Sequence, residues 1–541
     1  MNFWHMQIHP GNKDTSDVYI ALNNGYIGLG EWDEGENAIR DFINRMQIGD
    51  IVAVRKGPTP IALVEVIGDH DEFNEENHEW IRHIRKVRIL DRADDYSFII
   101  PKATGTLTIC ANPTASTTRV ITDWYSRILK EKEMTTIVGI LQQKKQIILQ
   151  GAPGVGKTYA TKEAALRLLG ESIPADRSVL NTQYQDAVKR GQIVFVTFHQ
   201  SMDYEDFVEG YKPAEGADGS PVFVLRDGPF KRIVDACYGR HADEAFEKAW
   251  TSFLESFEGK TNIEAKTIAK KTSFYVRLTD NGALRVGTDP NEPGQYTMTK
   301  QQIKDWVLHG IEPGYNPSYA KGVGKLLQDT YHVPPYSPDQ QRKPHVLIID
   351  EINRGNVSKI FGELITLLET DKREADPDRC GAQAETLSVK LTYSGESLTV
   401  PYNLYIIGTM NTADRSLGQI DYALRRRFAF YTIKSSRDAI ERFYEGKDEE
   451  LKNRALGVYD RVYSLFHPQD EGEGYVNRDF DPDDVMIGHS YFMASDKDEL
   501  EFKLRFELAP LLEEYRKDGI LVLDRDDPVF TGLLGALGAA R

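Results

Sequence analysis

A glycine-rich segment that ends in lysine and threonine is the strongest chemical pattern in the chain. In "QIILQGAPGVGKTYATKEAALRLL", a short apolar strand precedes "GAPGVGKT", which fits the phosphate-loop pattern G-x-x-x-x-G-K-[ST], and a helix-forming segment follows. Gly151, Gly154 and Gly156 are expected to let backbone amides face phosphate oxygens at a helix N-terminus. Lys157 would reach the β and γ phosphates, and Thr158 would hold Mg²⁺. The predicted nucleotide-binding residues are Gly151, Ala152, Pro153, Gly154, Val155, Gly156, Lys157, Thr158 and Tyr159.

Two adjacent carboxylates end a second apolar strand, in "HVLIIDEINRGNVSKIFGELITLLE". Asp350 is predicted to contact Mg²⁺ through its water shell, and Glu351 is placed to polarise the attacking water. An isolated "DE" would indicate only a strand that ends in exposed carboxylates. Beside a phosphate loop, the metal-binding and catalytic roles are favoured.

A third strand, in "NLYIIGTMNTADRS", runs into the small polar and charged residues Asn411, Asp414 and Arg415. Such residues are common in solvated turns and helix caps. If this strand lies between the phosphate-loop strand and the Asp350–Glu351 strand, Asn411 can orient the lytic water and detect the γ-phosphate. We therefore expect the strand to lie between those two.

Three consecutive arginines, Arg425, Arg426 and Arg427, follow in "LGQIDYALRRRFAFYTI". They are either a solvated cap or groups that reach the γ-phosphate of a neighbouring subunit and stabilise transition-state charge. The second role implies an active site between subunits.

Composition limits the elements that can position these residues. A chain of 541 residues should form two to four domains. Its net charge of −17 argues against non-specific coating of nucleic acid, so any DNA contact must use local patches or a ring assembly. The separated Cys110, Cys237 and Cys380 indicate neither a disulfide framework nor a zinc site, and we expect a cytoplasmic protein. No signal peptide or membrane span is evident.

The pattern along the chain predicts four segments. Residues 1–110 form short alternating strands. Residues 111–136 form a linker, the Thr/Ser-rich stretch "ANPTASTT", and then the helical segment "RVITDWYSRILKEKE". Residues 137–435 alternate strands and helices, as in an α/β domain with a mostly parallel sheet, and residues 436–541 form helices.

An insertion of about residues 241–340 is expected within the α/β segment, because Asp350 lies 193 positions after Lys157. Inside it, "SFYVRLTDNGALRV" predicts a hairpin around "DNG", and "TKQQIKDWVLHG" predicts a helix. A structural outgrowth and a contact with DNA or a partner are equally compatible with this pattern. The chain has no paired acid and lysine of a metal-dependent nuclease, so cleavage is expected to reside elsewhere.

Taken together, the phosphate loop, "FVTFHQSMDYEDFVEGYKP", "LIIDEINRGNVSKIFGELITLLE", "MNTADRS", "DYALRRRF" and "IGHSYF" resemble the McrB family of AAA+ GTPases. The resemblance covers about residues 137–515 and implies an α/β AAA+ core with a C-terminal helical lid. It further implies a hexameric ring that hydrolyses GTP in preference to ATP and acts with a separate McrC-like nuclease subunit. Because no residue is an evident guanine reader, ATP stays open from the residues alone.

The same resemblance gives roles to the polar residues after the third strand. "MNTADRS" is the family signature, so Asn411, Asp414 and Arg415 would act as water-orienting and sensor residues. Within "RRRF", Arg426 is the first candidate for the arginine that acts across the subunit boundary, and Arg427 is the second.

The N-terminal segment resembles the small β-barrel of the EVE and YTH-like branch of PUA folds, which accept a flipped, modified base. The segments that carry this resemblance are "NFWHMQIHPG", "GYIGLGEWDEG", "MQIGDIVAVRKG", "ALVEVIG" and "HIRKVRIL". A flipped base needs flat aromatic surfaces and a few polar groups at its edge. Candidates for the cage are Trp4, Tyr26 and Trp32, and candidates for the edge are Asn23, Asn24 and Asp33. In the alternative, the tryptophans belong to the barrel core.

Three functions are compatible with these patterns. The first is a GTP-driven restriction motor that recognises modified DNA. The second is an ATPase similar to the MoxR group that remodels a protein, with the N-terminal barrel as an adaptor. The third is a non-catalytic reader, which the intact set Lys157, Asp350, Glu351 and Asn411 disfavours.

Overall fold

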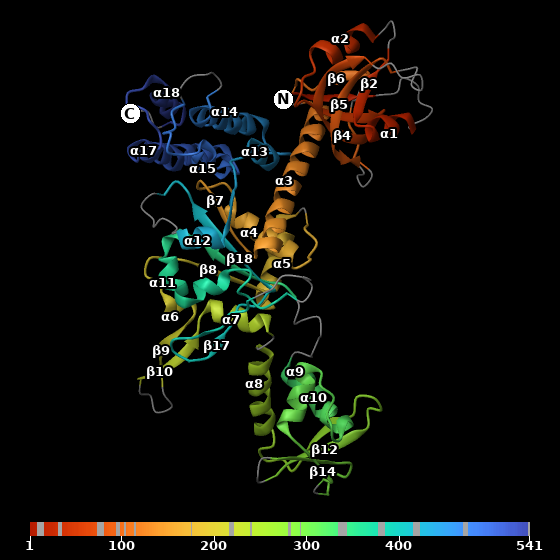
Figure 1. Cartoon of the computed structure of the whole chain (residues 1–541), viewed down its shortest axis with the longest axis vertical. Coiled ribbons are helices and arrows are strands. Elements are labelled where there is room, and N and C mark those ends of the chain that lie inside the picture. The colour runs from red at the N-terminus through yellow and green to blue at the C-terminus, as the bar shows by residue number, and fades with distance from the viewer. Residues whose placement is uncertain are drawn as a thin grey trace. The chain divides into compact units, whose positions relative to one another are not determined.

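The structure is a computed structural model, and its strands and helices are shown in Figure 1. It describes residues 1–7, 16–30, 35–72, 81–93, 98–101, 104–112, 115–174, 176–215, 221–238, 241–279, 283–292, 294–333, 343–376, 385–414, 422–468 and 474–538. The chain divides into two compact units. The first comprises Met1–Thr136 and Arg437–Asn453, and the second comprises Ile137–Ser436 and Arg454–Arg541.

The first unit is built on a six-stranded sheet with the strand order β2-β5-β4-β3-β1-β6. β1 and β3 are parallel, and the other neighbouring strands are antiparallel. Within the described residues no pairing joins the outer strands β2 and β6, so the sheet is not closed by backbone hydrogen bonds. Its strands and helices are β1 (Phe3–Met6), α1 (Ser16–Asn23), β2 (Tyr26–Leu29), α2 (Glu36–Asn44), β3 (Ile51–Lys56), β4 (Thr59–Glu72), β5 (His83–Arg92), β6 (Leu107–Ile109) and α13 (Arg437–Phe443).

A long helix, α3 (Ser116–Lys144), crosses the boundary between the two units. It begins inside the Thr/Ser-rich stretch that the sequence predicts as a linker. Trp124 explains why the N-terminal part of the helix is held in the first unit. Its side chain is fully buried, and its indole N–H donates to Asp91 Oδ2 at 2.7 Å.

The second unit contains a five-stranded sheet with the order β19-β7-β18-β15-β8, in which all neighbouring strands are parallel. β7, β15 and β18 are buried along most of their length, as expected for parallel strands covered on both faces. β18 lies between β7 and β15, as predicted. The carboxyl ends of these three strands therefore share one edge of the sheet.

The elements of this α/β core alternate along the chain. They are β7 (Gln146–Gly151), α4 (Lys157–Leu168), α5 (Arg177–Lys189), β8 (Ile193–Thr197), α6 (Tyr204–Phe207), β9 (Glu209–Glu215), β10 (Pro221–Asp227), α7 (Pro229–Cys237), β15 (His345–Asp350), η4 (Ile352–Arg354), α11 (Val357–Phe361), η5 (Gly362–Leu368), β16 (Val389–Lys390), β17 (Ser397–Leu398), β18 (Leu404–Asn411), α12 (Tyr422–Arg427) and β19 (Ala429–Thr432).

Between α7 and β15 the chain forms an inserted domain with its own hydrophobic core. Its four-stranded antiparallel sheet has the order β11-β12-β13-β14. The predicted hairpin is the pair β12 and β13, and the predicted helix is α9, which begins with a capping box at Thr299. Its elements are α8 (His241–Glu255), β11 (Ile263–Lys266), β12 (Ser273–Leu278), β13 (Leu284–Gly287), β14 (Tyr296–Met298), α9 (Lys300–His309) and α10 (Pro317–Tyr331).

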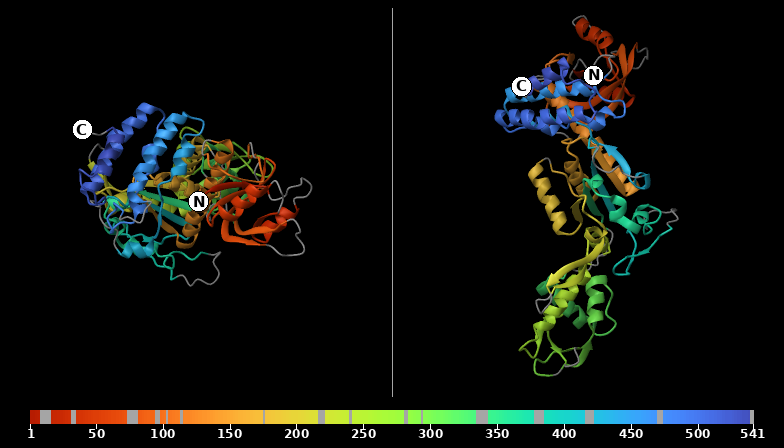
Figure 2. Two further views of the ribbon diagram at one scale, coloured as in Figure 1. Left: turned by 90° about the horizontal axis from the view of Figure 1, so that it is seen from above. Right: turned by 90° about the vertical axis from the view of Figure 1, so that its left-hand side faces the viewer.

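The C-terminal part of the chain is a bundle of helices, which lie side by side in Figure 2. Helix α14 begins in the first unit and continues in the second. The bundle comprises α14 (Glu449–Phe466), α15 (Pro482–Val485), η6 (His489–Phe492), α16 (Lys497–Lys503), the π-helical turn η7 (Leu504–Leu508), α17 (Ala509–Lys517) and α18 (Pro528–Ala536). Among the helices of the described residues, none has the length and hydropathy needed to cross a lipid bilayer.

Candidate nucleotide site

The predicted phosphate loop connects β7 to α4, and its glycines have the backbone angles that a phosphate cradle needs. The φ angles of Gly151, Gly154 and Gly156 are 147°, 81° and 86°, which side-chain-bearing residues rarely adopt. At Gly151 a Cβ atom would also lie 2.5 Å from the carbonyl oxygen of Ile433. Gly156 directly precedes α4, so the loop leads into the helix N-terminus.

Lys157 is 7% exposed, and its ammonium group is held by three oxygens. Nζ donates to the carbonyl oxygens of Gly151 and Ala152 at 2.8 Å each, and to Asn411 Oδ1 at 2.6 Å. Burial lowers the pKa of Lys157 from its usual 10.5 to about 8, against the opposing effect of the Glu351 and Asp350 carboxylates. A phosphate that replaced these neutral partners would favour the charged ammonium.

Asp350 and Thr158 meet at the carboxyl edge of the sheet. Thr158 Oγ1 lies 3.4 Å from Asp350 Oδ1, and the same carboxylate oxygen accepts a hydrogen bond from Thr409 Oγ1 at 2.6 Å. A hydroxyl and a carboxylate are oxygen ligands of the kind that Mg²⁺ prefers. The two predicted metal-binding residues are therefore neighbours.

Glu351 stands in a left-handed backbone conformation, with φ 52° and ψ 49°. This conformation costs a residue with a side chain about 1 to 2 kcal/mol. Its backbone N–H donates to Thr409 Oγ1 at 3.0 Å, and its Oε1 accepts from Asn411 Nδ2 at 2.7 Å. Arg354 Nε lies 3.4 Å from its other oxygen. Three contacts, with Thr409, Asn411 and Arg354, thus hold Glu351 in this strained conformation.

The two ends of the Asn411 amide join the lysine of the phosphate loop to the candidate catalytic carboxylate. Its oxygen accepts from Lys157 and its nitrogen donates to Glu351. The β18–β7 register explains this position, because Asn411 pairs with Gly151 at the ends of the two strands. Asp414 is half-buried just beyond, and Arg415 lies outside the described residues.

Thr409 is a site residue that the sequence analysis missed, although a signal for it exists. Residues two apart in a strand face the same side, so Thr409 shares a face with Asn411. Its hydroxyl bridges the Asp350 carboxylate and the Glu351 backbone.

The helical lid touches the phosphate loop through backbone hydrogen bonds. The Gly488 N–H donates to Pro153 O at 3.0 Å, and the Ser490 N–H donates to Gly154 O at 3.1 Å. A Cβ atom on Gly488 would lie 1.9 Å from the Gly154 carbonyl carbon. "IGHSYF" thus supplies the lid segment beside the loop, a role that the sequence did not assign to particular residues.

The three arginines of α12 differ in exposure. The Arg426 side chain is 66% exposed and its Nη2 lies 2.9 Å from Glu369 Oε1, whereas the Arg427 side chain is 5% exposed and lies 2.6 Å from the same oxygen. The exposed Arg425 lies over the Phe430 ring, with its guanidinium carbon 5.6 Å from the ring centroid. Of the two candidates, Arg426 is the one with a solvent-accessible guanidinium.

The remaining predicted nucleotide-binding residues lie around the loop. Ala152 and Val155 are buried, Pro153 is half-buried, and Tyr159 is half-buried at the first turn of α4. The Arg177 guanidinium carbon lies 4.8 Å from the centre of the Tyr159 ring. A positively charged group thus covers an aromatic ring beside the loop.

The predicted base cage is not assembled from open aromatic faces. Trp4 is fully buried in the core of the N-terminal sheet, and its indole N–H donates to Asp50 Oδ2 at 2.8 Å. Tyr26 is 7% exposed and packs against Ala21 and Ile81. Trp4 therefore has the core role considered as its alternative, because a base has no open face of its ring to stack on.

Of the other base-reading candidates, two are exposed to solvent and two lie outside the residues that the structure describes. Asn23 and Asn24 are exposed, and Asn23 Oδ1 accepts from Arg92 Nη2 at 2.6 Å. Trp32 and Asp33 lie outside the described residues.

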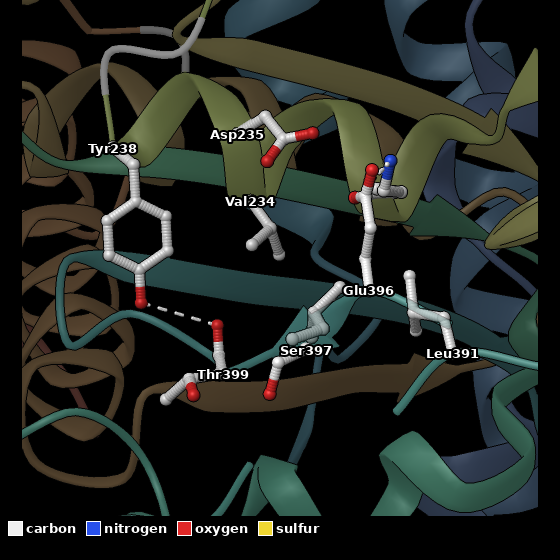
Figure 3. Close-up of a pocket in the computed structure, with 9 residues that line it drawn as sticks. Val234, Asp235, Tyr238, Leu391, Glu396, Ser397 and Thr399 are labelled. Atoms are coloured by element: carbon white, nitrogen blue, oxygen red, sulfur yellow. Dashed lines mark hydrogen bonds and ion pairs between the residues drawn. The ribbon is translucent and has the colours of Figure 1, made fainter. Parts of the chain in front are cut away.

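A separate hollow of about 160 Å³, open to solvent, lies between α7 and the β16–β17 hairpin (Figure 3). Tyr238, at the end of α7, donates from its hydroxyl to Thr399 O at 3.4 Å. Lys231 is already paired with Asp227 at 2.8 Å and with Glu396 at 3.1 Å. None of the predicted site residues lines this hollow, so it is distinct from the nucleotide site.

The residues at the sheet edge fit a nucleoside triphosphate with Mg²⁺. The glycine loop has positive φ angles, the lysine is buried among oxygens, and the hydroxyl–carboxylate pair is in place. A parallel sheet with this loop, an Asp–Glu pair on a second strand and a helical lid define an AAA-type nucleotidase domain.

Family comparisons agree with this class. Residues 314–428 match the AAA domain of the dynein-related subfamily, and residues 475–520 match the alpha-helical lid domain of McrB. The chain therefore carries a McrB-type AAA domain with its lid. Residues 7–107 match a domain of unknown function (DUF8426), so the role of the N-terminal domain in base recognition stays a prediction.

Two restriction proteins are similar to the chain. One is the "Type IV methyl-directed restriction enzyme EcoKMcrB subunit" of Escherichia coli K12, with 29% identity over 403 residues, which are 72% of this chain and 57% of that protein. The other is the "Type II restriction enzyme BsuMI component YdiS" of Bacillus subtilis 168, with 36% identity over 87 residues, which are 16% of this chain and 25% of that protein. The matches thus span just over half of the first relative and a quarter of the second.

Proposed function

We propose that the chain is the nucleotide-hydrolysing motor of a modification-dependent restriction system. In this proposal it assembles as a hexameric ring, prefers GTP to ATP, recognises DNA that carries a modified base, and activates a separate McrC-like nuclease subunit. The observation that carries the proposal is the Asn411 amide, which links Lys157 to Glu351 at the edge of a McrB-type AAA sheet. The similarity to the E. coli subunit supports the restriction context.

Each site residue has a separate role in hydrolysis. Lys157 and the loop amides bind the β and γ phosphates, and Thr158 and Asp350 hold the metal ion. When bound, Mg²⁺ offsets charge on the phosphate oxygens. Glu351 accepts a hydrogen bond from the attacking water and polarises it, and Asn411 fixes the carboxylate. Arg426 of an adjacent subunit would complete the site, because its guanidinium is exposed.

The test is nucleotide hydrolysis by the purified chain with GTP and with ATP. It is run with and without a McrC-like nuclease subunit, and with modified and unmodified DNA. We expect faster turnover of GTP, stimulated by the nuclease. Preference for ATP without any effect of nuclease or DNA would instead favour a protein-remodelling ATPase.

Two variants connect the activity to the site. Lys157→Ala should abolish nucleotide binding, because its ammonium contacts the ground-state phosphates. Glu351→Gln should retain binding but lose hydrolysis, because the carboxylate acts mainly on water. Fluorescent-nucleotide binding and phosphate release measure the two effects separately. Hydrolysis by Glu351→Gln at the wild-type rate would remove Glu351 from the catalytic role.

A further inference from the structure

In the part of the inserted domain that the structure describes, between α7 and β15, helices cover one face of the sheet. Helices α8, α9 and α10 lie on one side of the strands (Figure 1), and their buried residues share a core with one side of the sheet. The buried strand residues alternate along the chain, as the two-residue period of a strand requires. They are Ala265, Phe274, Val276, Leu284, Val286 and Met298.

The opposite face of this sheet carries basic residues around one tyrosine. Arg277 on β12 pairs directly with Arg285 on β13, and Tyr275 lies on the same face as Arg277. Lys266 on β11 faces the same side, as does one carboxylate, Glu264, which lies directly opposite Tyr275. Lys270 and Lys271 are exposed in the turn that joins β11 to β12. We name Lys266, Lys270, Lys271, Arg277 and Arg285 the basic sheet face.

The directly opposed arginines are unfavourable by themselves. Like charges that face each other across two strands destabilise a sheet. Arg277 donates to the carbonyl oxygen of Pro290, which is neutral and leaves its charge uncompensated. An anionic ligand would convert this repulsion into attraction.

Charge pairing differs between the two sides of the inserted domain. Lys304 on α9 lies 3.0 Å from Glu247, and on α10 Lys321 and Lys325 lie 2.6 and 2.8 Å from Glu312 and Asp329. By contrast, within the described part of the chain Lys266, Lys270, Lys271 and Arg285 form no ion pair. The positive charge of the sheet side is therefore left for an external partner.

We propose that the basic sheet face binds the phosphate backbone of double-stranded DNA. Arginine presents a planar set of donors that matches phosphate oxygens, and lysines in a turn add point charges. Such contacts strengthen binding without reading the sequence. In a chain with a net charge of −17, a local unpaired basic surface is the kind of place where DNA can approach. The choice of DNA rests on the proposed function, since an acidic protein surface offers related chemistry.

The test compares two full-length variants that lose the same number of positive charges. The first combines Lys266→Ala, Lys270→Ala, Lys271→Ala and Arg285→Ala. The control combines Lys248→Ala, Lys304→Ala, Lys321→Ala and Lys325→Ala, which lie on helices α8, α9 and α10. Binding of an unmodified duplex oligonucleotide is measured by fluorescence anisotropy at several salt concentrations, and circular dichroism checks the fold of each variant.

We expect the sheet-face variant to bind unmodified duplex at least about tenfold more weakly at low salt. The slope of log affinity against log salt should fall by about 0.9 for each DNA phosphate that the variant no longer neutralises. The control should bind as the wild-type chain does. Unchanged binding by a folded sheet-face variant, equal weakening in both variants, or no binding by the wild-type chain would each overturn the proposal.

An acidic protein partner gives a different result. If the sheet-face variant binds DNA normally but no longer responds to the nuclease subunit, the surface binds protein and the DNA assignment is wrong. Nucleotide hydrolysis without DNA is measured in parallel. A wild-type chain that binds duplex through this face yet hydrolyses no nucleotide would refute the proposed motor and leave the DNA surface standing.

Discussion

At the scale of single residues, we propose that the Asn411 amide couples nucleotide contact to catalysis. Lys157 Nζ donates to Asn411 Oδ1, while Asn411 Nδ2 donates to the Glu351 carboxylate. A γ-phosphate would compete for the same ammonium group. Binding can thus release one end of the amide, which makes the position of Glu351 sensitive to the terminal phosphate.

Replacement of this amide should separate binding from hydrolysis. In Asn411→Ala the Lys157 ammonium keeps its two backbone partners, so we expect nucleotide affinity to change only a few-fold. Hydrolysis should fall by about 10² to 10³, the effect of removing one preorganised polar group from an active site. Stopped-flow binding and single-turnover phosphate release measure the two quantities. Loss of binding as complete as in Lys157→Ala would show that Asn411 belongs to the binding site instead.

The sequence predicts this part of the site well, because few residue types can do the chemistry. Lys157, Asp350 and Asn411 end up within one hydrogen-bonded group, as their positions at strand ends indicate. The solvent exposure of the arginine side chains was not predictable from the sequence. Arg426 and Arg427 are adjacent in sequence, but tertiary packing buries one side chain and leaves the other in solvent.

At the scale of elements, the contact between lid and phosphate loop depends on one glycine. Gly488 has a φ of −69°, which any residue can adopt, so the backbone angle does not require glycine. The requirement is steric, because a Cβ atom there would overlap the backbone of Gly154. Backbone cannot move aside as the end of a flexible side chain can, so the lid itself would have to shift.

Gly488→Ala should therefore displace the lid and weaken the nucleotide site. Overpacking of this kind costs typically about 1 to 3 kcal/mol, and we expect both a lower Tm and a nucleotide affinity reduced about tenfold or more. Gly457→Ala in α14 is the matched control, since nothing lies within 4 Å of its added Cβ atom. Alanine is the better helix former, so this control should keep or slightly raise Tm. Equal melting and equal nucleotide affinity of Gly488→Ala and the wild-type chain would contradict the tight lid contact.

The order of the strands was predictable from the sequence. The residue at which a helix begins and the close contacts between distant loops were not. Apolar runs and the polar residues after them predict β7, β15 and β18, and the chemistry of the site requires β18 in the middle. The start of α3 at Ser116 was missed, because Ser and Thr are read as linker residues although they also begin helices. The close approach of Gly488 to Gly154 joins segments far apart in sequence, and no local pattern encodes it.

At the scale of the whole molecule, we propose that one chain does not form a complete site, and the proposal rests on how its arginines differ. The Arg427 guanidinium is buried against Glu369, so it is held inside its own subunit. Arg426 shares that carboxylate but keeps most of its side chain in solvent. An exposed ion pair of this kind contributes little stability, about 0 to 1 kcal/mol, so Arg426 can leave Glu369 for a stronger anion at little cost.

Mixed assemblies test whether Arg426 acts in a neighbouring subunit. Arg426→Ala subunits should bind nucleotide but hydrolyse it slowly, and Lys157→Ala subunits should not bind it. In a mixed assembly, an Arg426→Ala subunit retains its phosphate loop and can receive the intact Arg426 of a Lys157→Ala neighbour. Mixing two inactive preparations should therefore restore part of the hydrolysis, with a maximum near equal proportions.

Co-purification through two different affinity tags would first establish that the two variants assemble together. The control is a mixture of either variant with a chain that carries both substitutions. In neither of these mixtures can Lys157 of one chain and Arg426 of a neighbour occur in the same site. If proven mixed assemblies stay inactive, Arg426 does not act across the boundary. If Arg426→Ala alone hydrolyses at the wild-type rate, it has no catalytic role. Recovery only in the first mixture requires that a phosphate loop and an arginine from different chains meet at one nucleotide.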